Sequence, residues 1–294
     1  MMKEKFLEYL QVEKRYSPHT LTSYRKDLED FYAFVADTEG HEDLRKISHK
    51  VVRNFIAELS HKNIAKRSIN RKISSLRSFY LFLLKIGEIE TSPLENIQSL
   101  KFYAEKQIPF SQEEMHELQQ VVEASSDRPL LERLLIETLY QTGMRKAELC
   151  NLKLTDVDFS KGELRIIGKG NKIRVVPVSP ELLEQMSHYL EGRMPQKGSE
   201  EFFFVNVKGK NINPKFVYSV VNSYLSLVTS KTKKSPHILR HSFATHVLDN
   251  GAEISKVKKI LGHASLASTQ VYTNANIEQL KKVFANAHPR AKKE

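Results

Sequence analysis

Six polar residues in the second half of the chain have the types and spacing that chemistry on a phosphodiester needs. They are Arg145, Lys169, His237, Arg240, His263 and Tyr272. Attack at phosphorus builds negative charge on the phosphate oxygens, which guanidiniums stabilise, while imidazole and amine groups move protons to and from a nucleophile. Each residue alone has an ordinary structural interpretation, such as a helix cap, a local ion pair or a core tyrosine. Their combination is what indicates catalysis.

The local sequence places these residues at the ends and turns of predicted elements. Arg145 follows a Gly-Met pair near a predicted helix start, and Lys169 lies between two glycines at the tip of a predicted hairpin. His237 and Arg240 are three residues apart on a predicted helix, so both are expected on one face of it. His263 follows a predicted helix end. These positions suit side chains that must converge from separate elements.

A metal site is an alternative use for the histidines, and the sequence argues against it. His237, His241 and His246 share one predicted helix, but it lacks the Glu of an HExxH helix, and no Asp or Glu lies between residues 202 and 248. A two-metal nuclease would need several acids there. The Gly168-Lys-Gly170 turn lacks the GK[ST] ending of a phosphate-binding loop. We therefore expect no cofactor, no metal and no nucleotide hydrolysis, and we regard His241 and His246 as structural.

Composition limits the class of protein. The 294 residues include 46 Lys and Arg against 35 Asp and Glu, a net charge of +11, and one cysteine, Cys150, which excludes an intramolecular disulfide. Charges are scattered through the first sixteen residues, so no signal peptide is expected. The longest apolar stretch, residues 79–84, is far short of the ~20 residues that span a bilayer. The chain is expected to be soluble and cytoplasmic, and its charge suggests a polyanionic partner.

The basic residues gather in three tracts without acids, between Glu58 and Glu88, between Glu163 and Glu181, and over residues 202–248. Mixed charge is the usual surface arrangement, whereas acid-free basic surface suits contacts to a phosphate backbone. The predicted partner is therefore double-stranded DNA. The candidate DNA-binding residues are Lys66, Arg67, Arg71, Lys72, Arg77, Lys172, Arg174, Lys208, Lys233 and Lys234.

Residues 1–102 are predicted to form an all-helical domain of four-helix type. Ser17-Pro18 starts a helix in which apolar residues recur on one face as far as Val35. A second helix fits residues 51–59. A third begins near Ser68, with a buried apolar face and the five basic residues between 66 and 77 on the other. A short last helix is expected to open at residues 91–94.

Residues 103–110 are predicted to be a linker and residues 111–294 a second, mostly helical domain. Ser111 and Glu114 form a capping-box pattern, and residues 130–140 are an apolar helix. The period then changes to two, which predicts strands over 152–158, 163–167 and 173–178 in a small antiparallel sheet of three strands. The chain is helical again from residue 180, except for a short strand at 202–205. The fold class is thus mainly α, with two domains.

The motifs that carry the six residues resemble those of the tyrosine recombinase (phage integrase) family. They are TGMRKAEL, IGKGNKIRVVPV, PHILRHSFATH and LGHASLASTQVYT, in this order. The resemblance covers essentially the whole chain, and the tail and compact length look most like the Xer subgroup, which resolves chromosome dimers. Two departures lie outside the catalytic positions: Asn274 stands where Xer proteins commonly have His, and Met144-Arg-Lys146 replaces the more usual Leu-Arg-Val.

The resemblance implies a role for each of the six residues. Tyr272 is the nucleophile, and Arg145 and Arg240 hold the phosphate. His237 is the general base or a proton relay, His263 donates to the phosphate or stabilises the developing oxyanion, and Lys169 protonates the departing 5′ oxygen. A 3′-phosphotyrosyl bond keeps the energy of the broken bond, so neither ATP nor metal is needed. The N-terminal domain resembles a SAM-like core-binding domain that clamps DNA together with the catalytic domain.

The resemblance also implies partners. It favours a homo- or hetero-tetramer on DNA with a paralogous recombinase, a DNA translocase as activator, and a tail (about 276–294) that docks on a neighbouring protomer rather than on its own domain. Two alternatives stay open: a mobile-element integrase, and a non-catalytic architectural DNA-binding protein. The target sequence cannot be deduced without docked geometry.

Overall fold

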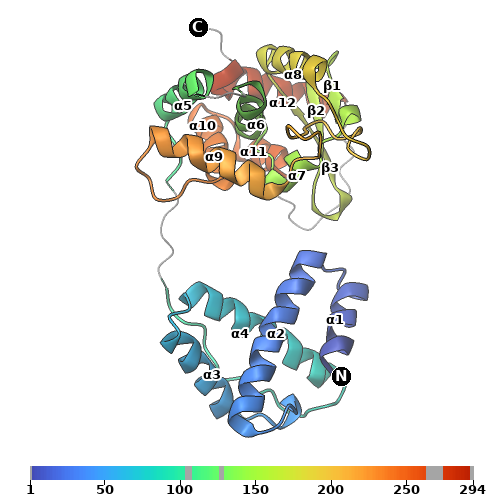
Figure 1. The fold of residues 1–294 in the computed structure, drawn as a ribbon, viewed down its shortest axis with the longest axis vertical. Coiled ribbons are helices and arrows are strands. Elements are labelled where there is room, and N and C mark those ends of the chain that lie inside the picture. Colours follow the sequence, from blue (N-terminus) through green and yellow to red (C-terminus); the bar gives the residue numbers. More distant parts are fainter. Residues whose placement is uncertain (1, 103–107, 126–128, 263–273, 292–294) are drawn as a thin grey trace. The chain divides into compact units, whose positions relative to one another are not determined.

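The computed structural model describes residues 2–102, 108–125, 129–262 and 274–291. The chain divides into two compact units, Met1–Glu105 and Lys106–Glu294, each with a hydrophobic core of its own (Figure 1). Among the residues that the structure describes, no helix is long and apolar enough to cross a bilayer.

The described part of the first unit contains four α-helices, and three of them lie where the sequence predicts helices, whereas the helix over residues 2–12 is not among the predicted ones. The four helices are α1 (Met2–Val12), α2 (Pro18–Glu39), α3 (His49–His61) and α4 (Lys66–Lys85). Ser17 caps α2 by accepting a hydrogen bond from the backbone N–H of Thr20, and Gly40 ends the helix in the left-handed conformation. Aromatic side chains fill the core, with the ring of Phe6 packed edge-on against Phe79.

The prediction of a short helix that opens at residues 91–94 is wrong. Residues 93–96 form a single turn, closed by a hydrogen bond from the backbone N–H of Glu95 to the carbonyl of Ser92 (3.2 Å). The chain beyond the turn is held on α4 instead, because the Asn70 side chain bonds both the N–H (2.7 Å) and the carbonyl of Leu100 (2.9 Å). These side-chain bonds replace the backbone bonds that a helix would supply.

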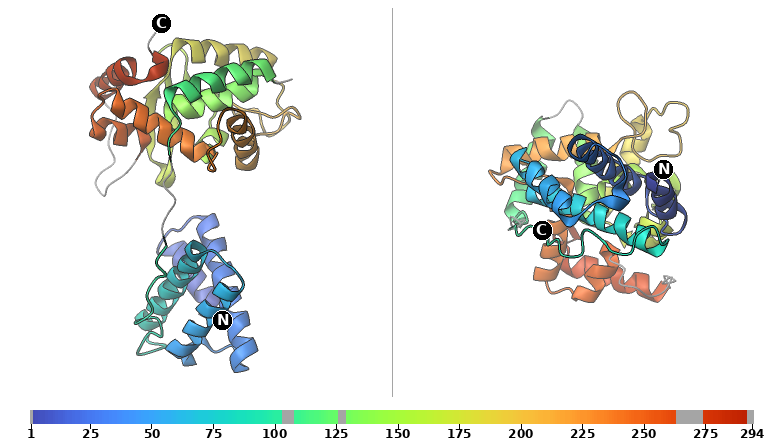
Figure 2. Two further views of the ribbon diagram at one scale, coloured as in Figure 1. Left: turned by 90° about the vertical axis from the view of Figure 1, so that its left-hand side faces the viewer. Right: turned by 90° about the horizontal axis from the view of Figure 1, so that it is seen from below.

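The second unit is mostly helical with one small sheet. Its helices are α5 (Gln112–Ser125), α6 (Pro129–Thr142), α7 (Lys146–Cys150), α8 (Pro180–Gly192), α9 (Pro214–Val228), α10 (Pro236–Asp249), α11 (Ile254–Leu261) and α12 (Asn274–Ala287). The Ser111–Glu114 capping box is confirmed by reciprocal hydrogen bonds of 2.7 and 3.1 Å. The apolar helix α6 packs against α5, α8 and α10 (Figure 2). The buried side chains around it form the core of this unit.

The antiparallel sheet has the predicted three strands, but the first is shorter than expected. The strands β1 (Val157–Asp158), β2 (Glu163–Ile167) and β3 (Ile173–Pro177) lie in the order β1-β2-β3. Residues 154–156 form a 3-10 turn, in which the Asp156 carboxylate accepts the Lys153 N–H (3.1 Å). The expected strand at 202–205 is reduced to isolated bridges that involve Phe202 and Val205.

The C-terminal helix α12 packs on its own domain. Leu280 and Phe284 are buried, and the helix contacts β3 and α10. Beyond it, the Arg290 guanidinium bonds the Glu137 carboxylate (3.0 Å), and His288 is wholly buried with its ring stacked on Phe284. This arrangement differs from the expected docking on a neighbouring protomer.

Candidate active site

Arg145 occupies the N-terminal end of α7, and one carboxylate fixes its position. Its backbone N–H donates to Glu148 Oε2 (2.8 Å), and its Nη1 donates to Glu148 Oε1 (2.8 Å). The Arg145 side chain remains 46 % exposed, whereas the Glu148 side chain is 6 % exposed. The guanidinium is thus oriented from its buried side and can reach a ligand from its exposed side.

Arg240 lies on α10 near Arg145, and its side chain is buried. Its Nη1 donates to the carbonyl of Gly143 and its Nη2 to the carbonyl of Leu261 (2.6 Å), so the guanidinium is tied to two turns of the chain. Burial lowers the pKa of Arg240 to about 10, with the charges of Arg145 and Arg174 acting in the same direction. Arg240 is therefore close to two other guanidiniums.

His237 lies one helical turn before Arg240 on α10, with its side chain exposed. Partial burial lowers the pKa of His237, and the positive charges of Arg240, His241 and Arg145 lower it further. A neutral imidazole is the form that can accept a proton. The structure thus brings Arg145, His237 and Arg240 together.

A buried ion pair lies behind these side chains. Glu148 accepts a hydrogen bond from Arg174 Nη2 (2.6 Å), and both side chains are nearly inaccessible. Burial alone would raise the pKa of Glu148, but the hydrogen bond and charge of Arg174, with those of Arg145, hold it below its usual range. The prediction that Arg174 contacts DNA at the surface is therefore wrong, because its guanidinium is turned inward to Glu148.

Lys169 begins the turn that joins β2 to β3. The hairpin is closed by a hydrogen bond from the N–H of Gly168 to the carbonyl of Lys172 (2.8 Å). Gly170 and Asn171 both have positive φ, of 73° and 58°, in the turn. The predicted position of Lys169 at the hairpin tip is confirmed.

His263 and Tyr272 lie outside the described residues. The structure reaches Gly262, which ends α11 in the left-handed conformation. The predicted roles of these two residues stay predictions.

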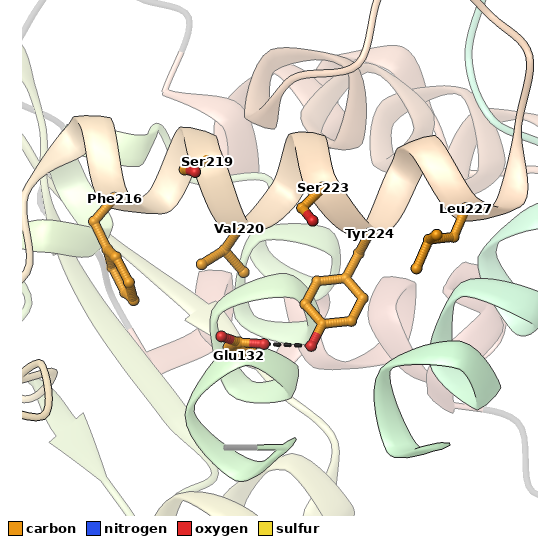
Figure 3. A pocket seen from close by; sticks show the side chains of 7 residues that line it. All are labelled: Glu132, Phe216, Ser219, Val220, Ser223, Tyr224 and Leu227. Atoms are coloured by element: carbon orange, nitrogen blue, oxygen red, sulfur yellow. Dashed lines mark hydrogen bonds between the residues drawn. The ribbon is translucent and has the colours of Figure 1, made fainter. Parts of the chain in front are cut away.

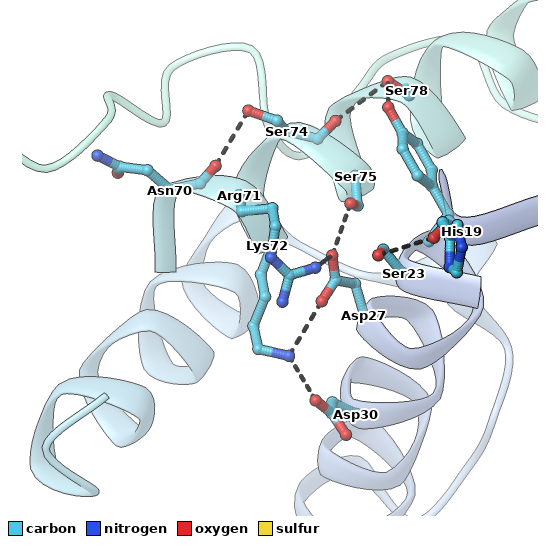
Figure 4. A network of polar contacts seen from close by, with 11 residues as sticks. His19, Ser23, Asp27, Asp30, Asn70, Arg71, Lys72, Ser74, Ser75 and Ser78 are labelled. Carbon is cyan, nitrogen blue, oxygen red and sulfur yellow. Dashed lines mark hydrogen bonds and ion pairs between the residues drawn. The ribbon is translucent and has the colours of Figure 1, made fainter. Parts of the chain in front are cut away.

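The basic residues of α4 do not share one exposed face. Lys66 and Arg67 are exposed, but Lys72 is buried and bonds Asp27 (3.2 Å) and Asp30 on α2 (Figure 4). Arg71 and Ser75 also bond Asp27, which is fully buried. The predicted DNA contact of Lys72 is wrong, because an isolated buried Asp27 would be costly and Lys72 compensates it. Arg77 is half-buried and bonds the carbonyl of Ile97.

The remaining candidate DNA-binding residues lie in the second unit. Lys172 follows the hairpin turn, Lys208 lies in the loop before α9, and Lys233 and Lys234 lie in the loop before α10. Lys234 is half-buried and the other three are exposed.

His246 has the structural role that the sequence suggests. It is buried, with Nδ1 2.7 Å from the Tyr140 hydroxyl and Nε2 2.7 Å from the carbonyl of Phe110. Within the described ranges, no group of three or more His, Cys, Asp or Glu side chains could hold a metal ion.

A shallow cavity of about 310 Å³ lies between α9 and α6, away from these groups. Its lining includes Phe216, Val220 and Leu227, and its polar contact is a hydrogen bond from the Tyr224 hydroxyl to Glu132 (Figure 3). Among the residues that the structure describes, its lining includes no predicted catalytic residue.

The sequence interpretation does not assign two residues of the site the roles that they have in the structure. The sequence offers a local ion pair as the ordinary interpretation of Arg145 and assigns Arg174 to the DNA surface, but it does not indicate the buried pair of Glu148 and Arg174. The signal for Glu148 was its position three residues after Arg145, the spacing of a capping box. For Arg174 the signal was an arginine inside a run of valines and isoleucines in a predicted strand.

Comparisons with known proteins agree on one family. Residues 109–279 match the model of the phage integrase family, and residues 4–87 match the phage integrase N-terminal SAM-like domain. Tyrosine recombinase XerC of Staphylococcus saprophyticus is 39 % identical over 296 residues, covering 100 % of this chain and 99 % of the relative. Tyrosine recombinase XerC of Staphylococcus aureus is 38 % identical, with 100 % and 98 % covered.

Solved structures share the fold at low sequence identity. XerH site-specific recombinase bound to its difH substrate aligns with a TM-score of 0.72 and 22 % identity, over 96 % of this chain and 84 % of that one. A lambda integrase dimer bound to a core site aligns with a TM-score of 0.71 and 16 % identity, over 92 % and 98 %. The expected mainly helical, two-part architecture with a three-stranded sheet is thereby confirmed.

Proposed function

The chain belongs to the phage integrase family of tyrosine recombinases, and we propose that its six motif residues perform site-specific strand exchange on DNA as an Xer-type recombinase. It is an enzyme of DNA cleavage and rejoining. The observation that supports the assignment of residues is that Arg145, at the start of α7, and Arg240 and His237, on α10, lie close enough for the arginine charges to lower the pKa of His237.

The geometry suits a phosphate. Three guanidiniums and one carboxylate, those of Arg145, Arg174, Arg240 and Glu148, leave a net positive charge among these four side chains for an anion to compensate. Forked guanidinium donors match two phosphate oxygens better than a lysine would. As charge builds on those oxygens in the transition state, the fixed donors stabilise it without reorganising.

In the proposed reaction the Tyr272 oxygen attacks phosphorus. His237 takes the phenol proton, the bond from phosphorus to the 5′ oxygen breaks, and Lys169 gives that oxygen its proton, so a 3′-phosphotyrosyl ester and a free 5′ hydroxyl result. His263 donates a hydrogen bond to the phosphate. A 5′ hydroxyl from another strand then reverses the steps. The energy of the broken bond stays in the ester, and no metal or ATP enters the balance.

The proposed partners are duplex DNA and further recombinase protomers. Relatives of the fold were solved on DNA substrates, which supports DNA as the partner here. We place the enzyme in the cytoplasm with the chromosome, as a homo- or hetero-tetramer with a paralogue, activated by a DNA translocase. In that assembly α12 would leave its own domain and dock on a neighbour. XerC relatives that cover the full chain favour chromosome-dimer resolution.

Covalent trapping tests this function. A nicked suicide duplex, which carries the site that the protein selects from a random pool, should form a protein–DNA adduct stable to denaturant. Tyr272→Phe should abolish the adduct, and a metal chelator should not. An adduct that survives Tyr272→Phe would contradict the nucleophile assignment. Absence of any adduct with the unsubstituted protein would favour the architectural alternative.

The mobile-element alternative makes a different prediction. A chromosome-resolving enzyme should recombine a single-copy chromosomal site beside housekeeping genes, whereas an integrase should recombine attachment repeats that flank its own gene. Recombination of two plasmid-borne copies of each candidate site distinguishes the two.

A further inference from the structure

Arg174 lies at the centre of the site and contacts three of the segments that form it. Its Nη2 bonds Glu148 Oε2 (2.6 Å), and Glu148 in turn holds both the backbone and the guanidinium of Arg145. A Cβ atom at Gly262, the residue before His263, would lie 3.3 Å from Arg174 Cδ. A Cβ atom at Gly168, the residue before Lys169, would lie 3.6 Å from Arg174 Nη1. The approach at Gly262 is tight, so the absence of a side chain there makes room for Arg174, whereas a Cβ atom at Gly168 would make an ordinary van der Waals contact.

The position of Arg174 in its strand is the reverse of what burial alone would select. In β3, Ile173 is 44 % exposed and Arg174 is 3 % exposed, so the charged residue faces inward and the apolar one faces out. The Nε–H of Arg174 is also buried, and it finds no acceptor among the described residues. A buried donor without an acceptor costs stability, and replacing a buried ion pair by apolar residues is often neutral or stabilising. Stability alone therefore does not explain this residue.

We propose that Arg174 is a positioning residue of the recombination reaction: by fixing Glu148 it orients the Arg145 guanidinium toward the scissile phosphate. The proposal rests on the function proposed above. Arg174 touches no reacting atom itself, since its side chain is 4 % exposed and is turned to Glu148. Without it, the Glu148 carboxylate would lose one of three donors and its alignment with Arg145.

The variant that tests the proposal is Arg174→Met, which keeps an unbranched side chain in the buried position and removes the guanidinium. We expect adduct formation to slow by about 100-fold, the cost of a displacement of about 1 Å in a catalytic group. Arg165→Met is the matched control. Arg165 is also a strand arginine bonded to a buried carboxylate, with its Nη2 2.8 Å from Asp156, but it lies outside the site. Its substitution should change the rate by less than about threefold.

Altered substrates separate positioning from general damage. A methylphosphonate at the scissile position carries no negative charge and therefore depends less on guanidiniums. The ratio of unsubstituted to Arg174→Met rates should shrink from about 100 to below about 10 on this substrate, as it should for Arg145→Lys. A 5′-bridging sulfur leaves without needing a proton, so the ratio of unsubstituted to Arg174→Met rates should not shrink on that substrate. The double variant Arg145→Lys/Arg174→Met should be little slower than either single variant, because both remove one orientation.

Each outcome of these experiments either supports or contradicts the positioning role of Arg174. An unchanged ratio on methylphosphonate, or additive losses in the double variant, would show that Arg174 only supports the fold and would overturn the proposal. Recovery on the 5′-sulfur substrate alone would overturn it in favour of an effect on Lys169. Absence of an adduct with the unsubstituted protein would instead contradict the proposed function, and the positioning role with it.

Discussion

At the scale of single residues, the two arginines predicted to hold the phosphate differ in exposure, since Arg145 is exposed and Arg240 is buried. Arg240 is held by the carbonyls of Gly143 and Leu261, while Arg145 is held by a carboxylate. The carboxylate of Glu148 is shared between Arg145 and Arg174. Partial burial lowers the pKa of His237, and the positive charges of Arg240 and Arg145 lower it further. The same electrostatics therefore serve phosphate binding and a neutral base.

This electrostatic environment has a consequence for the pH dependence of cleavage. A lowered pKa keeps His237 neutral at pH values where a free histidine, of pKa 6.5, is already half protonated. The rate of adduct formation should thus fall with a midpoint below pH 6.5, as the imidazole takes up its proton. Single-turnover rates from pH 4.5 to 8 measure this.

Two variants control for other titrating groups. His237→Gln should be slower throughout and should lose this acidic fall, while His241→Gln should reduce the local positive charge and move the fall to higher pH. A fall centred above pH 6.5 in the unsubstituted protein would contradict the electrostatic argument.

At the scale of elements, the turn between α6 and α7 sets the position of Arg240. Gly143 in this turn has φ of 57°, and a Cβ atom there would lie 2.6 Å from Phe243 and 2.7 Å from Leu261. Gly143→Ala should therefore cost about 3 kcal/mol, combining left-handed strain with overpacking. It should also slow cleavage, because the carbonyl that holds Arg240 must move. Urea unfolding and the adduct assay measure the two effects.

Gly251 supplies the matched control for this turn. It has φ of 89° with nothing within 4 Å of the added Cβ atom, so Gly251→Ala should cost only the backbone strain, about 1 kcal/mol. Equal losses of stability in the two variants would mean that the contacts around Gly143 are not restrictive.

Local patterns predicted elements better than they predicted the direction of charged side chains. Ser17-Pro18 and the Ser111–Glu114 pair mark helix starts through bonds within one turn, so sequence alone was sufficient. Lys72 faces inward because Asp27 meets it from a helix 45 residues earlier, and Arg174 does so because Glu148 lies 26 residues before it. No periodicity contains such long-range pairs, so both were assigned to the DNA surface.

At the scale of the whole molecule, each unit folds around its own core, and the two family matches fall one on each unit. Such units fold without sharing buried side chains. The net charge of +11 is distributed over both, but the structure removes some of it from any DNA surface through internal pairs. Lys72 with Asp27 and Asp30 is one such pair, and Arg174 with Glu148 is another. Total charge thus overstates the number of phosphate contacts.

The salt dependence of DNA binding counts those contacts. Each phosphate contact contributes about 0.9 to the slope of log affinity against log salt, so Lys66→Gln/Arg67→Gln should reduce the slope by about 2. Lys233→Gln/Lys234→Gln should also reduce the slope by about 2. The variant with all four substitutions should reduce the slope by about 4 if both units bind one duplex. Lys72→Met should leave the slope unchanged, since Asp27 and Asp30 already neutralise that ammonium group.

Fluorescence anisotropy of the full chain between 50 and 300 mM salt, with circular dichroism to confirm folding, gives the slopes. If either double variant kept the full slope, its unit would not contact phosphate through these residues, and a reduced slope for Lys72→Met would mean that the α2–α4 network opens on DNA.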